Sequence, residues 1–275
     1  MLLWALLFST LATAVLQESS ARLGLVTQRG LAANIKSGIK NKGLRFASLT
    51  LVLSAVVVGA IAYESGNIRG GSLGVLALLG AEHSKATDPL TGIAVLCIAV
   101  FAALLLWIGR YAVLEKVLVS LVILMSVAFL TTAVMVVDSW SLVLRGLFIP
   151  QIPEGSIMLV VALIGTTIVP YNLFLHSDIV REKWSSSAHL GEARTDAIVS
   201  VGFGGLISMA IVVCAAAVPA GTIQSAGDLA QGLAIVFGDA AKIMMAVGLL
   251  AAGLTSAITA PIAATLVLKG VFGWQ

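Results

Sequence analysis

Charged residues are scarce in this sequence, and the scarcity argues against an ordinary water-soluble domain. Asp, Glu, Lys and Arg make up 11% of the 275 residues, and 59% of the residues are hydrophobic. Soluble proteins carry about 25% charged residues. No polar stretch is long enough to form a second domain. The composition therefore predicts an all-α membrane protein whose residues 1–275 form a single transmembrane domain.

Residues and motifs that carry chemistry are also few. The two cysteines, Cys97 and Cys214, share no CxxC spacing, which argues against a disulfide framework or a zinc site. The three histidines are scattered, no acidic pair stands out, and there is no phosphate-binding P-loop. We therefore expect no enzyme, no bound cofactor and no use of ATP. The net charge of +3 is small and does not indicate nucleic-acid binding.

Apolar segments are what the sequence has in abundance, and about seven of them approach the length of a bilayer-spanning helix, which is about 20 residues. We expect the apolar stretch 71–81 to extend the second span or to lie at the interface, because it is too short to cross alone. The first segment could also be a secretory signal, although it lacks a basic N-terminal region. The expected spans run near 1–16, 46–63, 92–109, 113–137, 156–177, 197–220 and 243–268.

Basic residues alternate between the loops and predict an orientation. The loop 17–45 holds six of them, whereas the next loop, 64–91, holds only Arg69 and Lys85. By the positive-inside rule the first loop is cytoplasmic, which places the N-terminus outside. One further helix upstream would remove the awkwardness of an outside N-terminus without a signal. The six basic residues are Arg22, Arg29, Lys36, Lys40, Lys42 and Arg45.

The fifth expected span contains a pattern that predicts a broken helix near residues 165–170. Pro170 has no N–H, so the carbonyl of Thr166 loses its helical partner. Val169 precedes the proline and is pushed away from helical geometry. Gly165 can end one half-helix, and Pro170 suits the first turn of the next. The break is expected near the middle of the bilayer, where free carbonyls suit a cation. An ordinary proline kink without a ligand is the alternative.

The motif around this proline resembles a known family. The run Thr166–Ser177, TTIVPYNLFLHS, resembles the sixth-helix signature A-x-x-M-P-H-N-L-x-L-H-S of the NRAMP divalent metal transporters. Residues 21–27 are similar to the family's segment after its second helix, and 249–259 to its eighth helix. The resemblance implies a LeuT-like fold of two inverted five-helix repeats with helices one and six broken. On that map the chain runs from helix two to helix eight, so it looks truncated at both ends.

Three positions depart from the family's pattern and concern the transported metal. The resemblance assigns metal binding to Thr166, through the carbonyl where the family has Ala, and to Val169, where the family has a Met thioether. Tyr171 replaces the first histidine of the motif. Without a soft thioether, a site of oxygens and water suits a hard ion. These changes resemble the magnesium-transporting branch, so we expect Mg²⁺ to be preferred over Mn²⁺ or Fe²⁺.

Several other polar residues are candidates for the ion pathway, each with a plainer alternative. Glu64 is either a proton-coupling carboxylate or a side chain that reaches the interface. His176 either lines an exit path or packs through a hydrogen bond. Asn172 is expected to bridge freed backbone groups, with a role as a metal ligand as the alternative. Pro170 and Tyr171 are also expected to line the pathway or to support the site. Asp178 and Arg181 are expected to form a solvated ion pair at the cytoplasmic helix end.

Three functions stay open from the sequence. The favoured one is secondary transport of a divalent cation. It implies a multi-pass protein of a bacterial inner membrane, with the metal ion and membrane lipid as partners. The sequence gives no prediction of oligomeric state. The second is an organic-solute carrier of the same fold. The third is a non-transporting membrane fragment or subunit, which the missing first helix and its Asp-Pro-Gly-Asn motif would explain.

Overall fold

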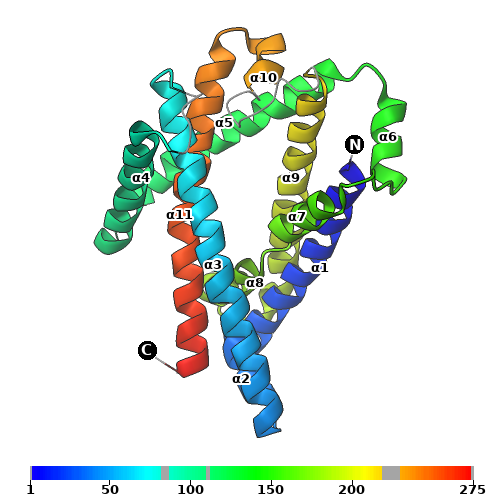
Figure 1. Cartoon of the computed structure of the whole chain (residues 1–275). Coiled ribbons are helices and arrows are strands. Elements are labelled where there is room, and N and C mark those ends of the chain that lie inside the picture. Colours follow the sequence, from blue (N-terminus) through cyan, green and yellow to red (C-terminus); the bar gives the residue numbers. More distant parts are fainter. Residues whose placement is uncertain (1, 82–86, 110–111, 219–229, 274–275) are drawn as a thin grey trace. The chain divides into compact units, whose positions relative to one another are not determined.

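The computed structural model describes residues 2–81, 87–109, 112–218 and 230–273 (Figure 1). All regular elements in these ranges are helical, so the predicted all-α class is confirmed. In chain order the elements are α1 (Leu3–Thr27), α2 (Leu31–Gly38), α3 (Lys42–Leu78), α4 (Pro89–Ile108), α5 (Ala112–Val136), α6 (Trp140–Phe148), α7 (Ile157–Thr167), α8 (Pro170–Lys183), the 3₁₀ turn η1 (Ser187–His189), α9 (Leu190–Ala216), α10 (Ala230–Phe237) and α11 (Ala240–Phe272).

Within the described residues, six helical segments are long and apolar enough to cross a bilayer. The prediction from sequence was about seven, based on a length of about 20 residues. The first expected span, 1–16, lies in α1, where the polar residues Gln17, Glu18 and Ser19 follow the apolar run and lower the hydropathy of the helix. The stretch after Gly71 extends α3 to Leu78, as expected. The chain is a multi-pass integral membrane protein.

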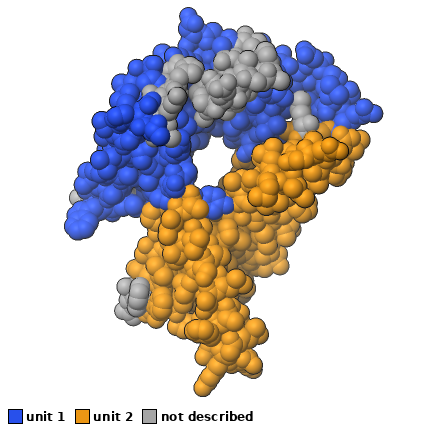
Figure 2. Space-filling model, viewed as in Figure 1, with its two compact units in different colours: residues 1, 63–145, 207–259 blue, residues 2–62, 146–206, 260–275 orange. Residues whose placement is uncertain are grey.

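The chain divides into two compact units, and the division passes through α3, α9 and α11 (Figure 2). Unit 1 comprises residues 1, 63–145 and 207–259, and unit 2 comprises 2–62, 146–206 and 260–275. Unit 1 contains Glu64, whereas unit 2 contains the interrupted helix. The two units are therefore described separately.

In unit 1, small residues bring α3 and α11 into close contact. A methyl group on Gly74 would lie 2.5 Å from the carbonyl oxygen of Ala246, and one on Gly253 would collide with the backbone of Gly71. In lipid there is no hydrophobic driving force between helices, so their association depends on close van der Waals packing. Small residues allow that packing because they let the backbones approach. The 249–259 segment that supported the family resemblance therefore lies at a helix–helix contact.

In unit 2, α1 packs against both α7 and α8. A core of fully buried side chains joins α1, α8 and α9, namely Ala21, Leu25, Val180 and Ala193. A methyl group on Gly24 would clash with the carbonyl of Ser177, so the backbones of α1 and α8 nearly touch at this point. The interrupted helix is thus supported along its length by α1.

Candidate metal-binding site at the interrupted helix

The helix over residues 157–183 is interrupted where the sequence predicted. Ile168 has φ −88° and ψ 80°, Val169 has φ −90° and ψ 115°, and Pro170 occupies the first turn of α8. Val169 is therefore extended, as expected for a residue that precedes proline. The expected end at Gly165 is wrong by two residues, because α7 continues to Thr167. Glycine permits a helix end but does not require one.

Proline alone does not cause the interruption. The helix α11 continues through Pro261 without a break. The difference lies in the preceding residues: four β-branched side chains, 166–169, come directly before Pro170, whereas Ala260 precedes Pro261. β-branched residues lose rotamer freedom in a helix, so this run adds to the cost that proline imposes. The β-branched run and Pro170 together therefore favour the end of one helix and the start of another.

Two of the carbonyls at the break are already used by the protein. The carbonyl of Thr167 accepts a hydrogen bond from the Thr13 hydroxyl of α1, at 3.3 Å. The carbonyl of Val169 accepts one from the backbone N–H of Asn172, at 3.2 Å. Neither oxygen is wholly free for a ligand, because each has at least one of its two lone pairs engaged.

The carbonyl of Thr166 is different. Its helical partner would be the N–H of residue 170, which proline lacks, and no residue that the structure describes donates a hydrogen bond to it. The Thr166 hydroxyl turns back to the carbonyls of Ala162 and Leu163, at 2.8 Å and 3.2 Å. This leaves a main-chain oxygen at the negative end of the α7 dipole, a place that favours a cation.

Hydroxyl groups of α1 hold the break and the start of α8 in place, and sequence reasoning missed them. Besides the Thr13 contact, the Ser20 hydroxyl donates to the carbonyl of Leu173 at 2.5 Å. The signal was present: Thr13, Ser20 and Thr27 recur every seven residues and so share one face of α1. A row of hydroxyls on an apolar helix indicates a helix–helix contact.

Ser20→Ala is expected to lower the free energy of unfolding by about 1 kcal/mol, because it removes a hydrogen bond between two membrane helices. The adjacent Ser19→Ala is the matched control, since among the described residues the Ser19 hydroxyl bonds only to the Val15 carbonyl within α1. Thermal unfolding of the detergent-solubilised variants measures both. Equal stability of the two variants would show that the Ser20 hydrogen bond does not contribute to the free energy of unfolding.

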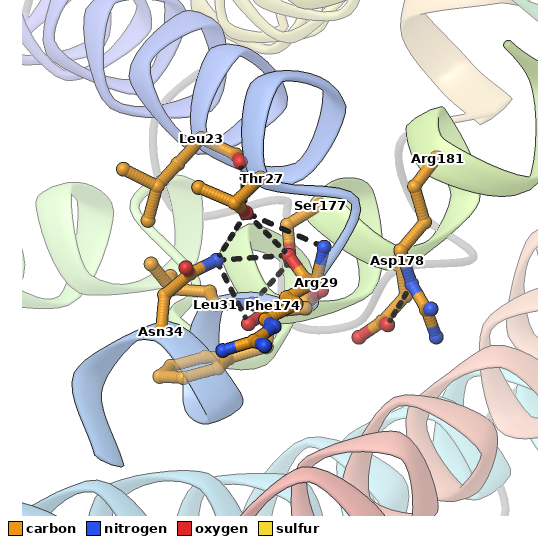
Figure 3. Close-up of polar contacts among 10 residues, drawn as sticks. Leu23, Thr27, Arg29, Leu31, Asn34, Phe174, Ser177, Asp178 and Arg181 are labelled. Carbon is orange, nitrogen blue, oxygen red and sulfur yellow. Dashed lines mark hydrogen bonds and ion pairs between the residues drawn. The ribbon is translucent and has the colours of Figure 1, made fainter. Parts of the chain in front are cut away.

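The turn between α1 and α2 is attached to the middle of α8 (Figure 3). The backbone N–H of Leu31 donates to the Ser177 hydroxyl at 2.9 Å. Within the turn, the Asn34 amide donates to the Thr27 hydroxyl at 2.8 Å and to the Arg29 carbonyl at 2.9 Å. The Leu31 bond holds the turn against α8, so the half-helix after the break is attached both to Ser20 of α1 and to the turn that follows α1.

The Asp178–Arg181 ion pair is present, with 2.8 Å between Oδ1 and Nε. Asp178 is only 7% exposed, however, so the expectation of a solvated pair is wrong. The reason is Gly30, whose backbone lies so close that a methyl group there would be 2.6 Å from the carboxylate. The carboxylate is thus covered by the α1–α2 turn, which sequence spacing does not reveal.

Most of the remaining predicted residues lie at the start of α8 or directly before it. Val169 and Tyr171 are buried, and the imidazole Nε2 of His176 is buried without a hydrogen bond from the described residues. The backbone N–H of Asn172 donates to the Val169 carbonyl, and the expected bridging role of Asn172 stays a prediction. Glu64 lies in unit 1, where its Oε2 is buried and likewise unpaired among the described residues. The roles of these side chains in transport stay predictions.

Side-chain metal ligands are few. Among the described residues, no three His, Cys, Asp or Glu side chains gather in a way that could hold an ion. The atoms that unit 2 offers as metal ligands at the break are main-chain carbonyl oxygens. A broken helix with free carbonyls, within a bundle of membrane-spanning helices, is the arrangement that secondary transporters use to bind ions.

Comparisons with known proteins agree with this class. The family model Nramp, described as natural resistance-associated macrophage protein-like, matches residues 1–275. The chain belongs to the Nramp family. Because this is a family of transporters, the expectation that the chain is not an enzyme is confirmed. The predicted family resemblance is likewise confirmed.

The chain is similar to proteins named as divalent metal cation transporters MntH. The one from Deinococcus radiodurans is 29% identical over 285 residues, covering 100% of this chain and 63% of its own length. The one from Ralstonia nicotianae is 30% identical over 284 residues, covering 98% of this chain and 62% of its own length. The chain thus spans less than two thirds of the length of these relatives.

The fold also matches a solved structure. The manganese transporter of Eremococcus coleocola superimposes with a TM-score of 0.78 at 23% identity, over 100% of this chain and 60% of that chain. The likeness shows the fold, and it confirms the predicted LeuT-like transporter architecture.

Proposed function

We propose that this chain forms part of a secondary transporter for divalent metal cations, with the Thr166 carbonyl as one of the oxygens that bind the ion. The observation that carries the proposal is the interruption between α7 and α8, which leaves this carbonyl without a donor among the described residues. Membership of the Nramp family and the names of the MntH relatives support the same substrate class. The ion is the transported substrate and not a resident cofactor.

We propose further that the preferred ion is Mg²⁺ ahead of Mn²⁺. Val169 stands where the family places a Met thioether, and a valine side chain offers no ligand atom. Soft thioether ligands favour transition metals, whereas a set of oxygens and water suits Mg²⁺. A preference for Mg²⁺ would distinguish this chain from the Eremococcus coleocola protein, which is named as a manganese transporter.

The basic experiment is uptake by the chain reconstituted into liposomes. A fluorescent indicator inside the vesicles follows Mg²⁺ and Mn²⁺ in parallel, with empty liposomes as the control. We expect uptake of both ions, with Mg²⁺ entering faster at equal concentration. A folded, correctly inserted chain that carries neither ion would contradict the transport proposal. Strong Mn²⁺ uptake with no response to Mg²⁺ would contradict the metal preference alone.

Val169→Met is expected to shift the ratio of Mn²⁺ to Mg²⁺ uptake towards Mn²⁺ by roughly tenfold, the equivalent of about 1.4 kcal/mol, because a thioether becomes available beside the break. Methionine is unbranched and adapts to a buried position such as this one. Val161→Met is the matched control, since Val161 lies exposed on α7 away from the break. An unchanged ratio in the Val169 variant would exclude this position from ion selection.

A further inference from the structure

A long stretch of the chain is basic without a single acidic residue. Between Glu18 and Glu64 there is no Asp or Glu, although six Lys and Arg residues lie in that interval. Two of the six are engaged: Arg22 pairs with Glu18 at 2.5 Å, and the Lys36 ammonium donates to the Val271 carbonyl at 2.7 Å. The other four form no ion pair with any residue that the structure describes, namely Arg29, Lys40, Lys42 and Arg45.

Three of the four basic residues elsewhere in unit 2 differ, because each lies close to an acidic side chain; the fourth is Lys269. Arg181 pairs with Asp178, Lys183 lies 3.5 Å from Asp196, and Arg194 lies 3.9 Å from Glu18. The charges of these residues are compensated within the chain. The four unpaired residues, which we call the basic surface, have no such compensation.

The segment that carries the basic surface is held in a fixed place on unit 2. Helix α2 is attached to α8 through the Leu31–Ser177 hydrogen bond, and to the end of α11 through Lys36. A methyl group on Gly270 of α11 would lie 3.0 Å from the side chain of Ala32, so the two helices are in contact. The basic side chains after α2 are therefore presented by an anchored element.

The start of α3 combines these charges with exposed apolar side chains. Leu44 is 59% exposed and Phe46 is 75% exposed, next to Lys42 and Arg45. Helix α3 has 37 residues. At 1.5 Å per residue it is about 55 Å long, which exceeds the hydrocarbon thickness of about 30 Å. Its first turns can therefore reach the headgroup layer.

We propose that the basic surface docks onto the headgroups of anionic phospholipids in the leaflet that faces loop 17–45. The occupant follows from charge complementarity, since four uncompensated cations, two of them next to exposed apolar side chains, match a lipid that has a negative head and an apolar tail. A free inorganic anion has no apolar part that could contact Leu44 and Phe46. The proposal rests on the chain's place in a membrane and is independent of the transported ion.

The test compares two double variants of the purified full chain. Phosphatidylglycerol or phosphatidylcholine is titrated in mixed micelles, and bound lipid is counted by native mass spectrometry while thermal unfolding is followed. K40Q/K42Q is expected to raise the half-saturating concentration of phosphatidylglycerol by at least roughly tenfold, because each basic side chain at an anionic surface contributes about a fivefold factor. K183Q/R194Q removes the same charge from paired positions and is expected to leave it unchanged.

Two further measurements keep the proposal falsifiable even if a variant folds poorly. Raising the salt concentration should weaken phosphatidylglycerol binding to the unmodified chain and leave phosphatidylcholine binding unchanged, because salt screens exposed charges. Inorganic phosphate at matched ionic strength should not displace phosphatidylglycerol. Equal losses in the two double variants, salt-independent binding, or displacement by inorganic phosphate would each overturn the proposal.

Discussion

Pro170→Ala is expected to lower uptake of divalent cations at least about tenfold, equivalent to about 1.4 kcal/mol. Alanine restores an N–H four residues after Thr166, and it has the highest helix propensity of all residues. The new donor can bond to the Thr166 carbonyl and join α7 to α8, which removes the oxygen proposed to bind the ion. The net value of such a hydrogen bond, about 1 kcal/mol, is comparable to the expected loss. Mg²⁺ uptake in liposomes and Mg²⁺ affinity by calorimetry are the measurements.

Pro261→Ala is the matched control for this experiment. Pro261 also lies in a membrane helix, but α11 continues through it without a break. Its replacement should therefore leave uptake and affinity close to those of the unmodified chain. If both variants lost uptake to the same degree, the effect would belong to proline in general. If Pro170→Ala retained full affinity, the Thr166 carbonyl would not be a ligand.

The break itself could be predicted from sequence because its causes are local. Pro170 lacks a donor, and Val169 is restricted by the ring that follows it, so both effects act within a few residues. Six of the seven expected spans could be predicted for the same reason, since each depends on a continuous apolar run. The exact end of α7 at Thr167 was missed, because helix ends shift by one or two residues at small cost.

The support of the break could not be predicted, because it depends on residues far apart in the chain. The Thr13 hydroxyl reaches Thr167 across 154 residues, and Gly30 covers Asp178 through the α1–α2 turn. The sequence shows the row of hydroxyl residues in α1 and the glycine at residue 30, but it does not show which residues they contact. The burial of Asp178 was missed for this reason: a charged residue near a helix end is ordinarily solvated unless the tertiary structure covers it.

Gly24→Val is expected to lower the free energy of unfolding by about 1–3 kcal/mol, the usual cost of overpacking, and to reduce uptake as well. The group that a side chain at residue 24 would meet is the backbone carbonyl of Ser177 in α8. Backbone cannot move aside as a flexible side chain does, so α8 would have to shift away from α1. The shift would pull on the contacts of Ser20 and Leu31 that hold the second half-helix. Thermal unfolding in detergent and uptake in liposomes measure the two effects.

Gly59→Val is the control for this substitution. Gly59 also lies inside a membrane helix of unit 2, but a methyl group on it would meet no described atom within 4 Å outside its own helical turn. Valine there should leave unfolding and uptake nearly unchanged, since a glycine in a helix interior is itself unfavourable by roughly 0.5–1 kcal/mol. A Gly24 variant as stable as the Gly59 variant would mean that α1 and α8 are not in backbone contact. A Gly24 variant that unfolds earlier while its uptake is unaffected would mean that α1 stabilises the half-helix without positioning the break.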